Sequence, residues 1–112
     1  PNQNIYRKEG VAEEDQTIKP VSYSVVKHGI MGLTKYLATY WGKKGVRVNT
    51  LCPVSLQNGQ DPEFIEKLSA LVPMGRMSRP DEYPATVLYM LSDASSYMTG
   101  ATVVLDGGRT IW

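Results

Sequence analysis

The sequence predicts an α/β fold in which parallel strands alternate with crossover helices. From residue 21 to 41, apolar residues recur every three or four positions, which is typical of a long helix. Two runs rich in β-branched residues, 46–52 and 101–105, have the composition of strands. Helical patterns separate these runs, and a strand–helix–strand order predicts a parallel pair. Because parallel strands need neighbours and cover on both faces, we expect two strands alone to be unstable.

The composition limits the possible functions. The chain has 112 residues, 12 basic and 11 acidic, so no excess charge indicates nucleic-acid binding. One cysteine and one histidine allow neither an internal disulfide nor a cysteine- or histidine-based metal site, and we expect no bound metal. No apolar run has transmembrane length, so we expect no membrane contact and a cytoplasmic location. The first residue is Pro1 and not methionine, and we interpret the chain as a piece of a longer protein.

Residues 1–20 are polar and lack a helical or strand period, which predicts a surface loop. The long helix is predicted to begin after Pro20, with Ser22 or Ser24 as its cap. Glycines and lysines at 42–45 are typical of its end. The stripe expected to face the core consists of Val26, Ile30, Leu33, Leu37 and Trp41.

A second strip of the helix contains two glycines. Each costs about 1 kcal/mol relative to alanine inside a helix, and the usual gain is close approach of another backbone. We therefore expect this strip to pack on a second helix; it consists of Val25, Gly29, Gly32 and Tyr36. His28 and Lys35 are expected on the solvent side.

The rest of the chain predicts a strand at Val46–Cys52 that ends at Pro53, with Cys52 as a small buried residue. A loop at 54–60 follows the strand, where α/β proteins bind ligands. Asp61 and Pro62 are typical of a helix start, and a short helix is expected from Phe64 to Val72. A further helix opens at Pro80 and precedes the last strand, 101–105; its inward residues are expected to be Tyr83, Val87, Met90 and Leu91.

Tyr23 and Lys27 form the candidate catalytic pair. Residues four positions apart lie one helical turn apart on the same face. A fixed ammonium beside a phenol favours the phenolate, which suits the phenol to proton transfer. With seven tyrosines in the chain, one such pair carries little weight, and Tyr40 with Lys44 forms a second.

Several motifs in one order make the chain resemble the short-chain dehydrogenase/reductase family. Tyr23-x-x-x-Lys27 matches the family's catalytic pair, and the strand that ends at Pro53 matches its penultimate strand. The resemblance continues through Pro73-Met74-Gly75-Arg76, Arg79-Pro80-Asp81-Glu82, Tyr97-Met98-Thr99-Gly100 and Leu105-Asp106-Gly107-Gly108. It implies that residues 21–112 are the C-terminal half of one Rossmann-type domain with a doubly wound parallel sheet, and that 1–20 precede its active-site helix.

The resemblance implies an oxidoreductase that uses NAD or NADP and acts on a small carbonyl or alcohol substrate. Tyr23 would exchange the proton at the substrate oxygen, and Lys27 would strengthen it as an acid and bind the nicotinamide ribose. The residues implied to contact the cofactor are Tyr23, Lys27, Pro53, Val54, Leu56 and Asn58. Members of the family form homodimers or homotetramers, in part through this helix.

Three departures from the family pattern leave other functions open. Val54 replaces the family's glycine, and a β-branched residue resists a positive φ, so we expect an altered loop. The family's substrate-polarising serine and its glycine-rich dinucleotide loop are absent from these residues. Val54 and the missing serine would suit a non-catalytic scaffold. The acidic residues 13–15 before Tyr23 instead resemble the extended branch of the family, which includes sugar-nucleotide epimerases and dehydratases.

Overall fold

The computed structural model describes residues 2–111, which form three α-helices and two strands. The helices are α1 (Val21–Trp41), α2 (Pro62–Ser69) and α3 (Pro84–Leu91), and the strands are β1 (Thr50–Pro53) and β2 (Thr102–Leu105). Short 3-10 helices lie at Gln3–Tyr6, Glu13–Asp15, Gly42–Lys44, Pro80–Glu82 and Asp93–Ser95. Among residues 2–111, no helix is both long and apolar enough to cross a membrane.

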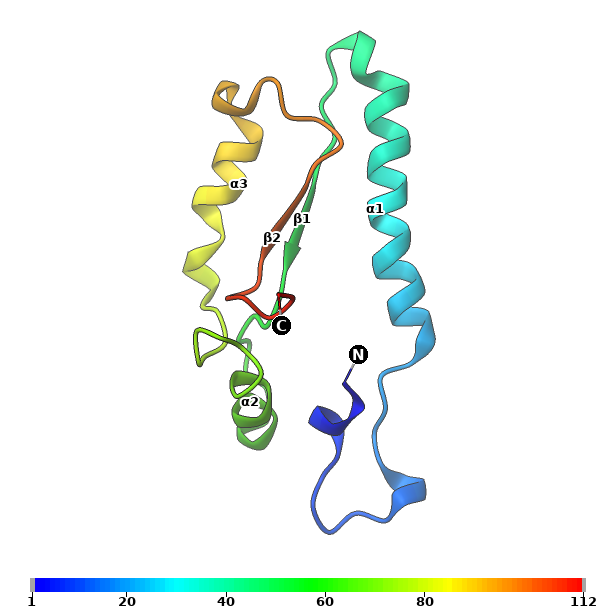
Figure 1. The fold of residues 1–112 in the computed structure, drawn as a ribbon, viewed down its shortest axis with the longest axis vertical. Coiled ribbons are helices and arrows are strands. Elements are labelled where there is room, and N and C mark those ends of the chain that lie inside the picture. The colour runs from blue at the N-terminus through cyan, green and yellow to red at the C-terminus, as the bar shows by residue number, and fades with distance from the viewer. Residues whose placement is uncertain (1, 112) are drawn as a thin grey trace.

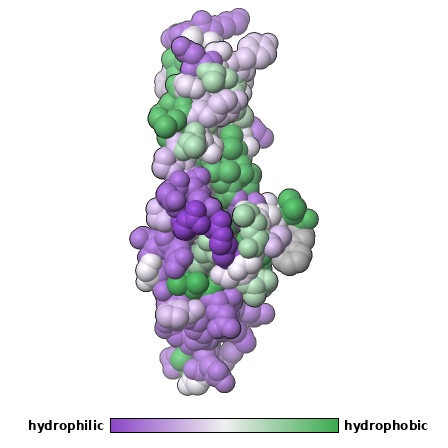
Figure 2. Space-filling view, turned by 90° about the vertical axis from the view of Figure 1, so that its left-hand side faces the viewer, coloured by the Kyte–Doolittle hydropathy of each residue, from purple (hydrophilic) through white to green (hydrophobic). Residues whose placement is uncertain are grey.

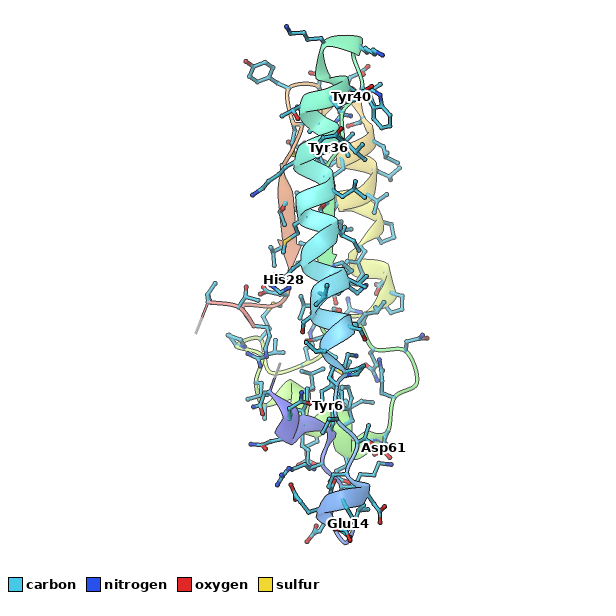
Figure 3. All side chains as sticks on the ribbon, turned by 90° about the vertical axis from the view of Figure 1, so that its right-hand side faces the viewer. Tyr6, Glu14, His28, Tyr36, Tyr40 and Asp61 are labelled. Carbon is cyan, nitrogen blue, oxygen red and sulfur yellow. The ribbon has the colours of Figure 1, made fainter. Side chains whose placement is uncertain are left out.

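The two strands pair in parallel, with Thr50 opposite Thr102 and Pro53 opposite Leu105. The sheet lies between α1 on one face and α3 on the other (Figure 1), and Figure 3 looks onto α1, with the sheet and α3 behind it. The connection from β1 to β2 passes through α2 and α3. This arrangement confirms the predicted α/β class and the parallel pair.

Both strands are shorter than predicted. β1 begins at Thr50 and not at Val46, because side chains take over the pairing of the preceding residues. Asn49 Nδ2 donates to the Met98 carbonyl at 2.8 Å, and Asn49 Oδ1 accepts from the Ala101 N–H at 3.0 Å. Asn49 thus adds side-chain links to the backbone hydrogen bond from the Gly100 N–H to the Val48 carbonyl, at 2.7 Å, that joins the two segments before the ladder begins. Cys52, predicted to be buried, is only half-buried.

The prediction of a serine cap for α1 was wrong. Pro20 is the N-cap residue with an extended backbone, no side chain caps the helix, and Ser22 and Ser24 lie inside it. At the other end, Gly45 adopts a φ of +75° and its N–H donates to the Gly42 carbonyl at 3.1 Å. This end matches the prediction, because glycine reaches the left-handed region without steric cost.

The face of α1 that meets the sheet carries small residues. Thr34 and Ala38 are its only buried residues in the described chain, and the Thr34 hydroxyl hydrogen-bonds the Thr50 hydroxyl of β1. The predicted core stripe was wrong in this chain, since Val26 is 58% exposed and Leu33 55% exposed. Small side chains bring the helix axis close to the strand, which leaves the larger ones beside the contact and not in it.

Of the shorter helices, α2 begins as predicted, whereas α3 begins four residues after the predicted start at Pro80. The Asp61 side chain accepts the Glu63 N–H at 2.9 Å and caps α2, which ends at Ser69, short of the predicted Val72. α3 begins at Pro84, after the 3-10 turn at Pro80–Glu82. Leu91, predicted to point inward, is 75% exposed, and Val87 is exposed as well, because α3 covers only two strands.

The packing of these elements is open. The radius of gyration is 17.1 Å, whereas a compact domain of this length has about 13 Å. The accessible surface is 8047 Å², against about 6,100 Å² for a compact protein of this mass. Figure 2, which faces α3, shows apolar patches among polar residues along its upper half. Within residues 2–111, the buried hydrophobic residues are Ala38, Val72 and Met77.

We predict that the isolated 112 residues do not form a stable domain. So little apolar surface is buried that the hydrophobic term cannot offset the entropy of ordering the chain. Circular dichroism should show no cooperative thermal transition, and titration calorimetry with NAD(H) and NADP(H) should show no micromolar binding. A sharp transition together with micromolar binding would contradict this prediction.

The turn at residues 73–78 is held by a two-pronged ion pair. Arg76 donates from Nη1 and Nη2 to the two Glu82 carboxylate oxygens at 2.8 and 2.6 Å, and the Arg79 N–H donates to Glu82 at 2.8 Å. These hydrogen bonds lower the pKa of Glu82 from 4.5 to about 2. Next to this turn, the backbone of Ser78 hydrogen-bonds Ser55 and Gln57 in the loop after β1.

We predict that Glu82 stabilises the full-length protein in a pH-dependent way. Because its pKa is lowered in the folded protein, the contribution of Glu82 to the free energy of unfolding is complete above pH 4.5 and is lost as the pH falls toward 2. The difference in melting temperature between the wild type and Glu82→Gln should therefore be constant above about pH 5.5 and shrink below about pH 4.5. A difference that does not change from pH 7 to pH 2.5 would contradict the role of the ionised carboxylate.

Candidate active site

Tyr23 lies in the first turn of α1 with its ring between two lysines. The side chain is 45% exposed. Lys27 Nζ is 5.5 Å from the ring centroid, and Lys19 Nζ is closer, at 3.9 Å. The helix thus brings the predicted pair together, while the chain just before the helix adds a second ammonium that the sequence analysis did not identify.

Tyr23 and the loop after β1 line one open cavity of about 660 Å³. α1 runs along the sheet in the direction opposite to β1, so the start of the helix lies near the end of the strand (Figure 1). Of the predicted cofactor residues, Pro53, Val54 and Leu56 belong to the cavity wall with Tyr23. Lys27 and Asn58 are exposed and do not line it.

The loop after β1 differs from the expectation for Val54. Val54 keeps an ordinary backbone, and its N–H donates to the Leu105 carbonyl at 3.0 Å. The positive φ, +61°, occurs at Ser55, the only non-glycine residue between 2 and 111 with such a backbone. The Ser55 carbonyl accepts the Ser78 N–H at 2.9 Å, which helps to hold this strained residue in place.

The loop presents polar groups that suit a carboxamide. The side-chain amide of Gln60 donates to the Leu56 carbonyl at 2.9 Å and accepts the Asn58 N–H at 2.7 Å. A nicotinamide carries the same chemical group. The Ser55 hydroxyl is buried and has no hydrogen-bond partner among the described residues, and such a group normally has one. The residues around the loop therefore fit the nicotinamide end of a dinucleotide.

Residues 2–20 contact α2 and form part of the cavity wall. Tyr6 packs on Phe64 with ring centroids 5.6 Å apart, and Lys67 Nζ donates to the Arg7 carbonyl at 2.6 Å. Figure 3 shows Tyr6 below the N-terminal end of α1, far along the molecule from Tyr36 and Tyr40. The predicted loop thus contains two 3-10 helices and packs against the rest of the chain.

The sequence analysis missed the other polar residues of the cavity, which include Lys19, Ser55, Gln60 and Arg109. The spacing of Lys19 was a usable signal, since it precedes Tyr23 by the same four residues by which Lys27 follows it. No comparable pattern marks the others. Within residues 2–111, no group of three or more histidine, cysteine or acidic residues could hold a metal ion.

Comparison with known proteins identifies relatives along most of the chain. The family model described as enoyl-(acyl carrier protein) reductase matches residues 9–110. Galactitol 2-dehydrogenase (L-tagatose-forming) from Cereibacter sphaeroides is 40% identical over 97 residues, which are 81% of this chain and 38% of that protein. An NADH-dependent L-xylulose reductase from Ambrosiozyma monospora is 41% identical over 101 residues, 82% of this chain and 37% of the relative. The chain thus spans under two fifths of these relatives.

The fold shows the same relationship. A short-chain dehydrogenase from Leptospira borgpetersenii with bound NAD+ superposes with a TM-score of 0.80 at 33% identity, over 91% of this chain and 40% of that structure. The α/β layers and the parallel pair described above are therefore part of a Rossmann-type fold. On the family match and this likeness, the chain belongs to the short-chain dehydrogenase/reductase family.

Proposed function

We propose that these residues supply the proton-transfer group and the nicotinamide-side loop of an NAD- or NADP-dependent oxidoreductase that interconverts an alcohol and a carbonyl. The supporting observation is that Tyr23 and the loop at Pro53–Leu56 line one cavity. A relative named as an NADH-dependent reductase and one solved with bound NAD+ support the choice of cofactor. Because the chain is shorter than its relatives, the proposal concerns the full-length protein.

The proposed chemistry centres on the Tyr23 hydroxyl, which is accessible from the cavity. In reduction the hydroxyl donates its proton to the substrate oxygen, and in oxidation the phenolate accepts the proton. The bound nicotinamide supplies or accepts the hydride. Lys27, with its ammonium 5.5 Å from the Tyr23 ring, stabilises the phenolate by its charge and binds the ribose.

The loop after β1 is proposed to orient the nicotinamide. Its carboxamide would take the place of the Gln60 amide on the Leu56 carbonyl and the Asn58 N–H. The buried Ser55 hydroxyl would gain its missing partner there. Pro53 and Val54 would supply apolar contact to the nicotinamide, and their pairing with Leu105 keeps their backbone in place.

We predict that Tyr23→Phe removes most turnover of the full-length enzyme without unfolding it. Loss of a general acid or base typically lowers kcat by about 10²- to 10⁴-fold. Tyr40→Phe is the matched control, because Tyr40 also precedes a lysine by four residues, and Lys44 Nζ lies 5.9 Å from its ring. Steady-state kinetics should show near-normal kcat for Tyr40→Phe. If Tyr23→Phe kept a near-normal kcat and the melting temperature of the wild type, the catalytic assignment would be wrong.

The second strip of α1 is proposed to form a contact between subunits. Val25 is 65% exposed and Tyr36 63% exposed. A Cβ built on Gly29 or Gly32 would meet no atom of the described chain within 4 Å. The strip is thus free for another helix, and a homodimer or homotetramer of the full-length protein would cover it.

We predict that Gly32→Leu disturbs assembly of the full-length protein. A leucine at a close helix contact overfills it, which typically costs about 1–3 kcal/mol. Light scattering should show a smaller assembled mass, or the melting temperature should fall. Lys35→Leu is the control, since Lys35 is exposed like Gly32 but does not belong to the strip. Equal mass and melting temperature for Gly32→Leu and the wild type would rule out this interface.

A further inference from the structure

The cavity beside Tyr23 has an unbalanced charge. Its wall contains two cationic side chains, Lys19 and Arg109, and no acidic residue among the described ones. Both cations are half-buried, and within residues 2–111 neither forms an ion pair. Charged groups that are shielded from solvent are normally paired. The two cations therefore lack the counter-charge that such a position calls for.

Lys19 is held in place on both sides. Its N–H donates to the Gln3 side chain at 2.9 Å, and its carbonyl accepts from the same amide at 3.3 Å. Its ammonium lies 3.9 Å from the ring centroid of Tyr23 and 5.5 Å from that of Tyr6. The Gln3 hydrogen bonds hold the backbone of Lys19, and its charge lies beside the ring whose hydroxyl is proposed to meet the substrate oxygen.

Arg109 lines the cavity from the turn after β2. The acidic residue of that turn, Asp106, already accepts hydrogen bonds from other groups. The Asp106 carboxylate accepts the Gly108 N–H at 2.9 Å and both the N–H and the hydroxyl of Thr110, at 2.8 and 2.6 Å. The Arg109 N–H donates to the Asp106 carbonyl at 3.1 Å, which holds the backbone of the arginine. Within residues 2–111 no side-chain hydrogen bond or ion pair uses the guanidinium, so its donors can meet a ligand.

We propose that the substrate carries an anionic group, a carboxylate or a phosphate, close to its reacting carbonyl or alcohol carbon, and that Lys19 and Arg109 bind this group. The proposal rests on the proposed oxidoreductase function and names its substrate class. Two neutral polar residues of the same wall that are not assigned to the nicotinamide, Asn2 and Thr110, suit a hydroxylated carbon chain. The alternative is a purely structural role for Lys19, as a cation that packs on the rings of Tyr6 and Tyr23. The experiment has to distinguish this role from anion binding.

The test uses the full-length protein and three sugars that share a ketone at the second carbon. D-Fructose carries a hydroxymethyl group beside it, 2-keto-D-gluconate a carboxylate and D-fructose 1-phosphate a phosphate ester. We compare kcat/KM for each anionic sugar with kcat/KM for D-fructose. In Lys19→Gln this ratio should fall about tenfold, mainly because KM for the anionic sugar rises. That is the size expected for the loss of one charge-assisted hydrogen bond at a partly exposed site. Lys19→Arg should restore the ratio, and Arg109→Gln should lower it. Lys35→Gln, which changes an exposed lysine of α1 away from the cavity, is the matched control.

The two anionic sugars show whether a carboxylate or a phosphate is preferred. A fall of equal size for all three sugars in Lys19→Gln would overturn the proposal, because it would show that Lys19 acts on the position of Tyr23 alone. Preference of the wild type for D-fructose would overturn it as well.

Absence of nicotinamide-dependent turnover with every sugar would count against the proposed function and not against the anion site. Titration calorimetry of the full-length protein with oxamate and with inorganic phosphate, without added cofactor, then decides whether the anion site exists. Binding that weakens about tenfold in Lys19→Gln supports the anion site. Equal binding by wild type and variant, or none by either, overturns it.

Discussion

The close contact of α1 with the two-stranded sheet determines where Tyr23 lies relative to the loop after β1. The contact depends on small residues, since Thr34 hydrogen-bonds Thr50 of β1 and Ala38 lies next to Gly100, just before β2, where a Cβ added to Gly100 would be 3.5 Å from the Ala38 Cβ. Helix and strand run in opposite directions, so the start of α1 meets the end of β1. Tyr23 and the Pro53–Leu56 loop come together for that reason alone. A larger residue at Thr34 or Ala38 would push the helix outward and separate the phenol from the loop.

The sequence predicted the elements and their order because these depend on local chemistry. The Asp61 cap, the proline starts and the glycine end at Gly45 each act within a few residues, and the structure bears them out. The sequence did not predict which face of α1 is buried. Hydrophobic periodicity identifies the apolar faces of a helix, but it does not identify which face contacts the sheet. Thr34 and Ala38 are weak signals in such a pattern, although they make the contact. The early start predicted for β1 failed for a related reason, since Asn49 pairs through its side chain.

The candidate site was predictable where a motif is local and not where the fold assembles it. Tyr23 and Lys27 are one turn apart, so the helix alone brings them together. Lys19 joins them only because Gln3 holds its backbone, and Arg109 joins them from the far end of the chain. Contacts of this kind depend on how residues 2–20 pack on α2. The periodicity of apolar residues in the sequence does not predict that packing. Identification of the family supplied what spacing could not, namely a reason to prefer Tyr23 over Tyr40.

The backbone of the loop after β1 bears on whether this chain could be a non-catalytic scaffold. That hypothesis relied on Val54, which was expected to distort the loop by resisting a positive φ. The strained φ of +61° falls instead on Ser55, while Val54 keeps its place in the ladder opposite β2. Strain of this kind costs about 1–3 kcal/mol and persists where the surroundings enforce it, which is commonest at functional sites. Here Ser78 enforces it, and Arg76 with Glu82 anchors the turn next to Ser78. The loop is thus held in a strained conformation, and the buried Ser55 hydroxyl has no hydrogen-bond partner among the described residues. Both features favour a ligand site over a scaffold that has lost its ligand.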